Sequence, residues 1–74
     1  MWSTGTLHIE DSTVSFWVKH FEEGSRFGIA GGRISKLHLQ LSGNDVCLYE
    51  RGWGLMPTCK IAEIALDSLL KKYN

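Results

Sequence analysis

The sequence has little of what marks secreted, membrane-spanning or strongly charged proteins. It contains two cysteines, one proline and no long apolar run, and its eight acidic residues balance its eight basic ones. A transmembrane helix needs about 20 consecutive apolar residues, and the stretch after Met1 lacks the basic residues of a signal peptide. We therefore expect neither a membrane span nor a leader. A net charge of zero also provides no overall field that would attract nucleic acid or an anionic membrane.

Cys47 and Cys59 are too few for a disulfide framework, and they do not have the spacing of a CxxC motif. Small secreted domains are rich in disulfides, whereas cytosolic proteins keep their thiols reduced. We therefore expect two free thiols in a cytoplasmic protein, with a disulfide between them as the alternative.

The chain has enough apolar residues for one small core. Its 74 residues are 43% hydrophobic and include three Trp, three Phe and two Tyr. This composition argues against disorder, and the length suits one domain with little surplus stability. We expect a single domain over residues 1–74.

Alternating apolar and polar residues predict β-strands over much of the chain. The pattern indicates five strands, at residues 4–10, 14–20, 26–29, 34–41 and 46–50. Short turns would join them into an antiparallel meander. These turns are predicted at Asp11-Ser12, near residues 22–24, at Gly31-Gly32 and at Gly43-Asn44.

The turns also predict which residues face each other across the sheet. They set Ile9 opposite Val14, Val18 opposite Phe27, Ile29 opposite Ile34, and Leu39 opposite Leu48. Ile34 and Leu37 both suit the core, but they have opposite parity along an extended strand. We therefore expect a β-bulge near Ser35-Lys36.

The remaining residues predict one amphipathic helix. Pro57 and Thr58 are residue types favoured at helix starts, and Lys71 and Lys72 lie where the helix dipole favours positive charge. Apolar residues recur between them at helical spacing, namely Ile61, Ala62, Ala65, Leu66, Leu69, Leu70 and Tyr73. One such helix can cover one face of a sheet. The expected fold is α+β, a five-stranded antiparallel β-meander with one C-terminal α-helix packed on one face.

The other face of the sheet would carry aromatic and basic side chains. By the predicted registers these are His8, Trp17, Lys19, Arg26, Arg33, His38, Tyr49 and Arg51, with Gly28 beneath the Trp17 indole. Such a face can stack bases and contact phosphates, and an exposed aromatic cluster also suits a protein partner. The structural alternative is that Trp17 and Tyr49 only cover glycines and neighbouring side-chain stems.

Trp53 lies between Gly52 and Gly54, where it either plugs the end of the core or anchors a partner. Taking both regions together, we predict partner contacts by Trp17, Arg26, Arg33, Lys36, Tyr49, Arg51 and Trp53.

We predict no catalytic, cofactor-binding or metal-binding residues. The strands that carry His8 and His38 would be about 14 Å apart, too far for a shared zinc ion. Ser35 and Lys36 are adjacent on a strand and would point to opposite faces. The glycines at 28, 31 and 32 lie between two predicted strands, so they lack the helix N-terminus of a phosphate-binding loop.

Four segments resemble a small family of bacterial and phage or mobile-element proteins of similar length. They are the runs Phe-Gly-Ile (27–29), Gly-Gly-Arg-Ile-Ser-Lys-Leu (31–37), Tyr-Glu-Arg-Gly-Trp (49–53) and Leu-Leu-Lys-Lys-Tyr-Asn (69–74). That family has no assigned activity, so the resemblance implies a genomic setting and no mechanism. Small proteins of mobile elements often act by stoichiometric binding to host proteins.

The sequence therefore predicts a non-enzymatic protein-binding module, an inhibitor or accessory protein of a mobile element or phage. The alternative is a single-stranded nucleic-acid or RNA-binding module that uses the open sheet face. A homodimer is also expected, through an edge strand or the Trp17 face, since the first and last strands of a meander have open edges.

Overall fold

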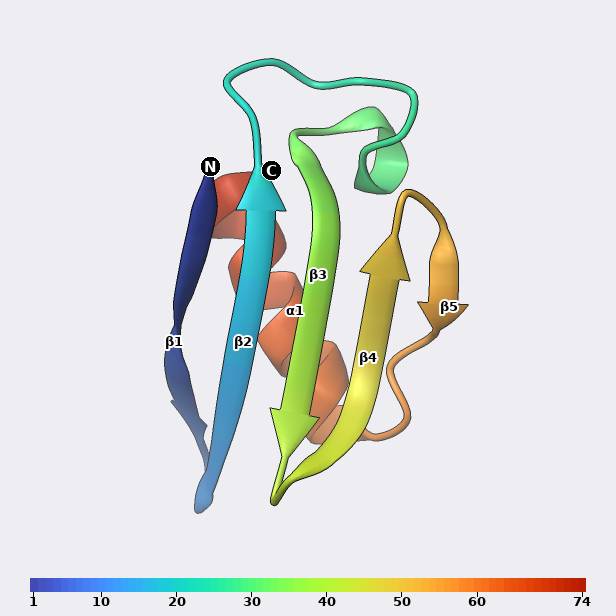
Figure 1. The fold of residues 1–74 in the computed structure, drawn as a ribbon. Helices are drawn as coiled ribbons and strands as arrows, with labels where there is room; N and C mark the ends of the chain where they lie inside the picture. The colour runs from blue at the N-terminus through green and yellow to red at the C-terminus, as the bar shows by residue number, and fades with distance from the viewer.

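Five antiparallel strands and one helix make up the fold in the computed structural model, which describes residues 1–74 (Figure 1). The strands lie side by side in chain order: β1 (Trp2–Ile9), β2 (Ser12–His20), β3 (Ile34–Leu41), β4 (Asn44–Glu50) and β5 (Trp53–Leu55). Helix α1 (Lys60–Tyr73) crosses the sheet on the side away from the viewer in Figure 1. The predicted fold class, a five-stranded antiparallel meander with a C-terminal helix on one face, is confirmed.

The strand predicted at residues 26–29 does not form. This part of the chain belongs to a long connection between β2 and β3 that contains one short 3₁₀ turn, η1 (Ile29–Gly31). Strand β2 pairs directly with β3, so Val18 lies opposite Leu37 and not opposite Phe27. The predicted pairing of Ile29 with Ile34 across a two-residue turn is also wrong.

Local hydrogen bonds and left-handed backbone angles curl this connection. The Gly28 N–H donates to the Ser25 carbonyl at 3.0 Å, and the Gly31 N–H donates to the Gly28 carbonyl at 3.0 Å. Ala30 and Gly31 have φ angles of 53° and 73°, which strand residues do not adopt. A Cβ atom on Gly28 would overlap the Gly32 carbonyl. The glycines thus let the loop pack closely against itself.

The fifth strand is one that the sequence pattern did not indicate. Strand β5 has three residues, too few for alternation to be recognised, and it follows Arg51, whose φ angle is 60°. It pairs with β4 through Leu48–Leu55 and Tyr49–Trp53. The edge of residues 46–50 that was expected to be open is therefore partly covered.

The first hairpin is displaced by two residues from the predicted register. Leu7 lies opposite Val14, and Ile9 lies opposite Ser12. The turn after Ile9 includes Glu10 in a left-handed conformation with a φ angle of 56°. Because side chains alternate with a period of two, this displacement leaves the predicted core face unchanged.

The last hairpin also turns one residue earlier than predicted, and its register then changes again at a bulge. Leu41 pairs with Asn44, so the turn consists of Ser42 and Gly43, with φ angles of 53° and 78°, instead of the predicted Gly43-Asn44. The pairing then shifts by one residue next to Leu39, which leaves Val46 as the extra residue of a β-bulge.

This bulge reverses the parity of β4. Leu39 lies opposite Cys47 and not opposite Leu48. Cys47 and Tyr49 are consequently buried, whereas Leu48 is only half-buried and lines the opposite face. A one-residue change of register moves every following side chain to the other face of a sheet.

The β-bulge predicted near Ser35-Lys36 is present. Lys19 lies opposite Lys36, while the next residue, His20, lies opposite Ile34, so Ser35 is the additional residue on β3. The bulge allows Ile34 and Leu37 both to be buried despite their opposite parity.

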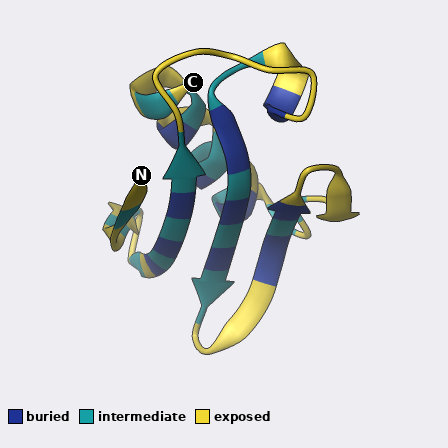
Figure 2. Cartoon of the chain, turned by 45° about the horizontal axis from the view of Figure 1, so that its top comes forward, coloured by how far each residue is buried: buried dark blue, intermediate teal, exposed yellow.

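The core lies between the sheet and α1, where buried residues alternate with partly exposed ones along β2 and β3 (Figure 2). Its largest fully buried residues are Ile34, Leu37, Leu39, Leu69, Val14, Val18 and Cys47. Helix α1 adds Ala62, Ala65 and Leu69. The two alanines are completely buried, and their small side chains let the helix approach the sheet closely.

Helix α1 begins later than the predicted start at Pro57 or Thr58. Its first residue is Lys60, and Cys59 is the N-cap residue, with no hydrogen bond from its side chain to the helix. The Thr58 N–H donates to the Val46 carbonyl at 3.0 Å. This bond ties the residue before the cap to β4, and Cys59 itself is extended, with φ and ψ angles of −154° and 169°, so the helix starts after it.

The structure also describes the state of the two cysteines and the length of the helix. Cys47 and Cys59 are both free thiols, so the alternative of a disulfide does not occur. Helix α1 has 14 residues, and neither its length nor its apolar content suffices for a membrane span.

Candidate binding surfaces

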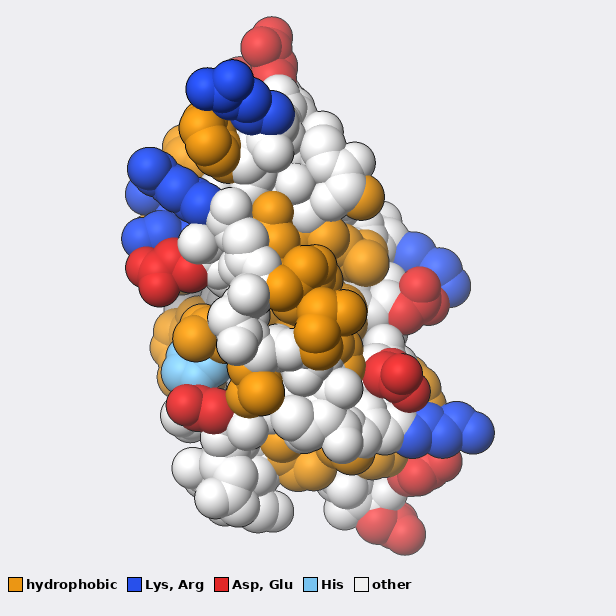
Figure 3. Space-filling view, turned by 90° about the vertical axis from the view of Figure 1, so that its right-hand side faces the viewer, with side chains coloured by type: hydrophobic (Ala, Val, Ile, Leu, Met, Phe, Trp, Pro, Cys, Tyr) orange, Lys and Arg blue, Asp and Glu red, His pale blue; other side chains and the backbone are white.

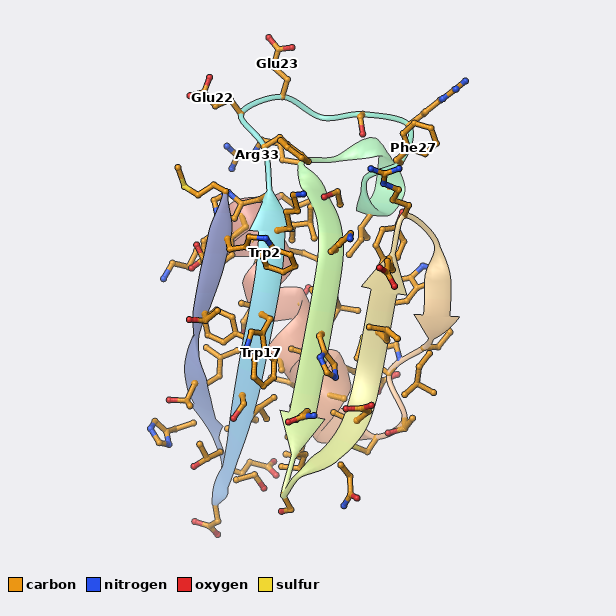
Figure 4. All side chains as sticks on the ribbon, in the orientation of Figure 1. Trp2, Trp17, Glu22, Glu23, Phe27 and Arg33 are labelled. Atoms are coloured by element: carbon orange, nitrogen blue, oxygen red, sulfur yellow. The ribbon has the colours of Figure 1, made fainter.

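Trp17 occupies the middle of the sheet face that α1 leaves open (Figure 4). Strands β2 and β3 set it directly opposite His38, and the two ring centroids are 5.2 Å apart with an interplanar angle of 31°. The predicted position of Trp17 on this face is correct. The residue that it meets is His38, however, and not Gly28, because β2 pairs with β3.

A hollow of about 330 Å³ lies beside this pair of rings. Its lining consists of Trp2, Trp17, Lys36, Leu37, His38, Leu48, Tyr49 and Glu50. The side chains of Leu37 and Tyr49 are buried in the core, so these two residues contribute the floor of the hollow. The indoles and Leu48 make its walls apolar.

Paired polar side chains surround the hollow. The Lys36 ammonium is 3.3 Å from the Glu50 carboxylate, and His38 Nε2 is 2.7 Å from Asp45 Oδ1. Gln40 Nε2 donates to the same Asp45 oxygen at 2.9 Å. Hydrogen bonds from Gln40 and then His38 lower the pKa of Asp45. The open face therefore has an apolar centre and a rim of polar side chains that are bonded in pairs.

Trp2 is a part of this site that the sequence pattern missed. Its side chain is 55% exposed, and the Lys19 ammonium lies 5.9 Å from the indole centroid. Strand β1 begins at Trp2 and not at residue 4, which places Trp2 opposite Lys19 on the open face. Leu48 is the second residue of the site that the pattern missed. The pattern predicts Leu48 in the core, because the bulge at Val46 leaves no mark in the sequence.

The predicted position of Tyr49 on the open face is wrong. It was expected on the open face, but its side chain is 6% exposed and lies in the core. Its hydroxyl donates to the Phe27 carbonyl at 2.8 Å. Tyr49 thereby ties the connection between β2 and β3 to β4.

Arg26 and Arg51 lie away from the hollow, next to Phe27. Their guanidinium carbons are 4.9 Å and 5.9 Å from the centroid of the Phe27 ring. Phe27 is itself exposed. Trp53 meets the Tyr49 ring edge-on at 5.0 Å and is 41% exposed. Viewed from the side of β5, hydrophobic side chains gather in the middle of the molecule (Figure 3).

Arg33 lies in a third place, beside a second hollow of about 360 Å³ that it shares with Met1, His20, Phe21 and Glu22. Burial lowers the pKa of His20, and the positive terminal amino group and Arg33 lower it further. Of the predicted contact residues, the structure thus brings only Trp17 and Lys36 together at the open face.

The three histidines have ordinary hydrogen-bond partners. His8, His20 and His38 lie 3.2 Å from Thr13, 2.9 Å from Ser3 and 2.7 Å from Asp45 respectively. Burial raises the pKa of the Cys47 thiol to about 11, so this thiol is protonated near neutral pH and is a poor nucleophile.

These features define a small α+β domain with one face of its sheet open to solvent. The chain belongs to the family described as a domain of unknown function, DUF7678, which matches residues 1–74. No curated protein and no solved structure matches the chain.

Proposed function

We propose that this chain is a non-enzymatic protein-binding module whose contact surface is the open sheet face around Trp17. The observation that supports this most is the apolar hollow between Trp2, Trp17 and Leu48 with its rim of paired polar side chains. Protein interfaces concentrate their binding energy in a few central residues, often tryptophans, inside a ring that excludes water. The open face has this organisation.

The same surface suits a protein better than a nucleic acid. Binding of single strands combines stacking aromatics with basic groups that follow the phosphate backbone. Here Lys36 faces Glu50 and His38 faces Asp45. The arginines at 26, 33 and 51, which could contact phosphates, do not line this hollow. A single-stranded nucleic-acid ligand remains the alternative that an experiment must test.

We further propose that the partner is a host protein, bound in a fixed stoichiometry in the cytoplasm. The resemblance to small proteins of bacteria, phages and mobile elements supports a host partner. The free thiols of Cys47 and Cys59 support a reducing compartment.

The test compares three baits in pull-downs from a bacterial host lysate: the wild type, Trp17→Ala and Trp53→Ala. Trp53 is the matched control because it is also a partly exposed tryptophan, but it lies on β5 outside the hollow. We expect a protein that the wild type and Trp53→Ala capture and that Trp17→Ala loses. With the captured protein purified, light scattering should give a complex of fixed stoichiometry.

Two outcomes would contradict the proposal. One is a captured protein that Trp17→Ala retains and Trp53→Ala loses, since the contact surface would then be the β5 side. The other is tight, salt-sensitive binding of poly-U or mixed single-stranded DNA that depends on Trp17, because steep salt dependence is the mark of phosphate contacts.

A further inference from the structure

Strand β1 is an open edge of the sheet (Figure 1). It pairs with β2 on one side only, and it is eight residues long. No residue from Trp2 to Ile9 is Lys, Arg, Asp, Glu or Pro. Natural proteins usually protect edge strands with such residues, because a bare edge pairs readily with another strand.

The hydrogen bonds next to β1 show which of its backbone groups point outward. Met1 and His20 exchange two bonds: the Met1 nitrogen donates to the His20 carbonyl at 3.0 Å, and the His20 N–H donates to the Met1 carbonyl at 2.9 Å. Along an antiparallel pair, every second residue makes such an exchange. The odd-numbered residues of β1 therefore bond to β2. The outward-pointing groups belong to Trp2, Thr4, Thr6 and His8.

We propose that β1 pairs antiparallel with β1 of a second copy of this chain, about a two-fold axis that passes at Gly5. In this register Trp2 lies opposite His8 of the second copy, and Thr4 lies opposite Thr6 of the second copy. Each of the four outward-pointing residues then exchanges backbone hydrogen bonds across the axis. The proposal is independent of the proposed function.

The side chains of β1 fit this pairing with itself. Threonine opposite threonine is a favourable cross-strand pair, whereas like charges in these positions would repel, and the edge has none. Gly5 brings no side chain to the axis, and the Phe16 ring lies against it within the same copy. Leu7 and Ile9, which are half-buried at this edge of the core, would be covered further by the second copy.

A second copy suits this edge better than an unrelated strand, because the register that satisfies every outward group is also the symmetric one. The opposite edge of the sheet offers no equivalent, since β5 has only three residues. Two-fold homodimers are also the commonest assemblies of soluble proteins. The two open faces would join into one continuous surface.

The first test is amide hydrogen exchange measured by NMR across a dilution series of the intact protein. In the monomer, the amides of Thr4, Thr6 and His8 have no partner and should exchange fast. With rising concentration these amides should become protected, while those of Gly5 and Leu7 change little because they already bond to β2. Sedimentation of the same samples should report the dimer.

The second test uses charges at the two exposed threonines. In Thr4→Lys/Thr6→Lys, lysines face each other twice across the axis, and the dimer should weaken at least about tenfold at low salt. In the matched control Thr4→Lys/Thr6→Glu, each introduced lysine faces an introduced glutamate, so the dimer should be at least as tight as the wild type. Circular dichroism establishes that both variants fold.

The controls also separate this register from its neighbours. If the axis lay at Thr4 or at Thr6, Thr4→Lys/Thr6→Glu would set two lysines or two glutamates against each other and weaken the dimer. A weaker dimer in that variant overturns the proposal. So does a protein that stays monomeric at every concentration, or a dimer whose Thr4, Thr6 and His8 amides stay unprotected.

Discussion

The side chain of Asn74 holds the backbone of Ile34: its Oδ1 accepts a hydrogen bond from the Ile34 N–H at 2.9 Å. The amide nitrogen of the same side chain donates to the Ile29 carbonyl at 3.1 Å, and the Asn74 backbone N–H donates to the Leu70 carbonyl at 3.1 Å. One residue thus joins the C-terminal end of α1 to both sides of η1. A Cβ atom on Gly32 would overlap the Asn74 amide. The glycine-rich run and the end of the chain therefore form one structural contact.

This contact predicts that Gly32→Ala destabilises the fold. The added methyl group would displace the Asn74 amide and break its two bonds to the loop, at a cost of about 1–3 kcal/mol in the free energy of unfolding. Asn74→Ala should cost a similar amount. Gly52→Ala is the control, since a Cβ there meets nothing within 4 Å. Urea unfolding measures all three, and equal midpoints for Gly32→Ala and Gly52→Ala would contradict the prediction.

The contact also shows why the loop between β2 and β3 could not be predicted from the sequence. Residues 26–29 alternate as a strand does, and Gly31-Gly32 has the composition of a tight turn. What decides the conformation is a bond from Asn74, forty residues away from Ile34, together with the Tyr49 hydroxyl on the Phe27 carbonyl. Such distant partners leave no trace in a local pattern.

Where the local pattern was sufficient, it predicted the structure well. The alternation of Val14, Phe16 and Val18 identified the core face of β2, and the change of parity after Ile34 identified a bulge. The bulge at Val46 had no such sign, because Val46 and Leu48 alternate as cleanly as Cys47 and Tyr49 do. This bulge is the main reason why the residues of the candidate site were predicted wrongly, since it places Leu48 instead of the Tyr49 side chain on the open face.

The two cysteines should differ sharply in reactivity. Cys47 is completely buried, and burial raises the pKa of its thiol to about 11. Cys59 is only half-buried at the start of α1. Because the thiolate is the reactive form, a thiol reagent at neutral pH should label Cys59 first in the folded protein. Mass spectrometry after short labelling would locate the adduct, and in denaturant both cysteines should react. Rapid native labelling of Cys47 would contradict its placement in the core.

Stability should fall in mildly acidic solution because of His20. Its pKa is lowered in the folded state, first by burial and then by the terminal amino group and Arg33. Above the ordinary histidine pKa of about 6.5, both folded and unfolded chains hold His20 neutral, so the effect is absent. Below it, the unfolded chain takes up the proton more readily, and stability decreases as the pH falls towards the folded-state pKa. Urea midpoints from pH 8 to pH 5 measure this loss.

His20→Gln provides the control for this pH dependence. Glutamine keeps a polar side chain near Ser3 but cannot take up a proton, so the decrease between about pH 6.5 and pH 5 should become smaller. The lowered pKa of Asp45 adds its own loss of stability only at more acidic pH, as that carboxylate becomes protonated. An unchanged pH profile in His20→Gln would show that another group is responsible.

Tyr49→Phe separates a structural role from a role in partner contact. The substitution keeps the buried ring and removes the hydroxyl that donates to the Phe27 carbonyl at 2.8 Å. We expect a loss of about 1 kcal/mol in unfolding free energy and faster amide exchange in residues 25–32, because the connection between β2 and β3 loses its bond to β4. Capture of a partner that depends on Trp17 should be unchanged, since the hydroxyl points into the molecule and away from the open face. A variant that unfolds like the wild type but no longer captures the partner would instead show that the Tyr49 hydroxyl contacts the partner.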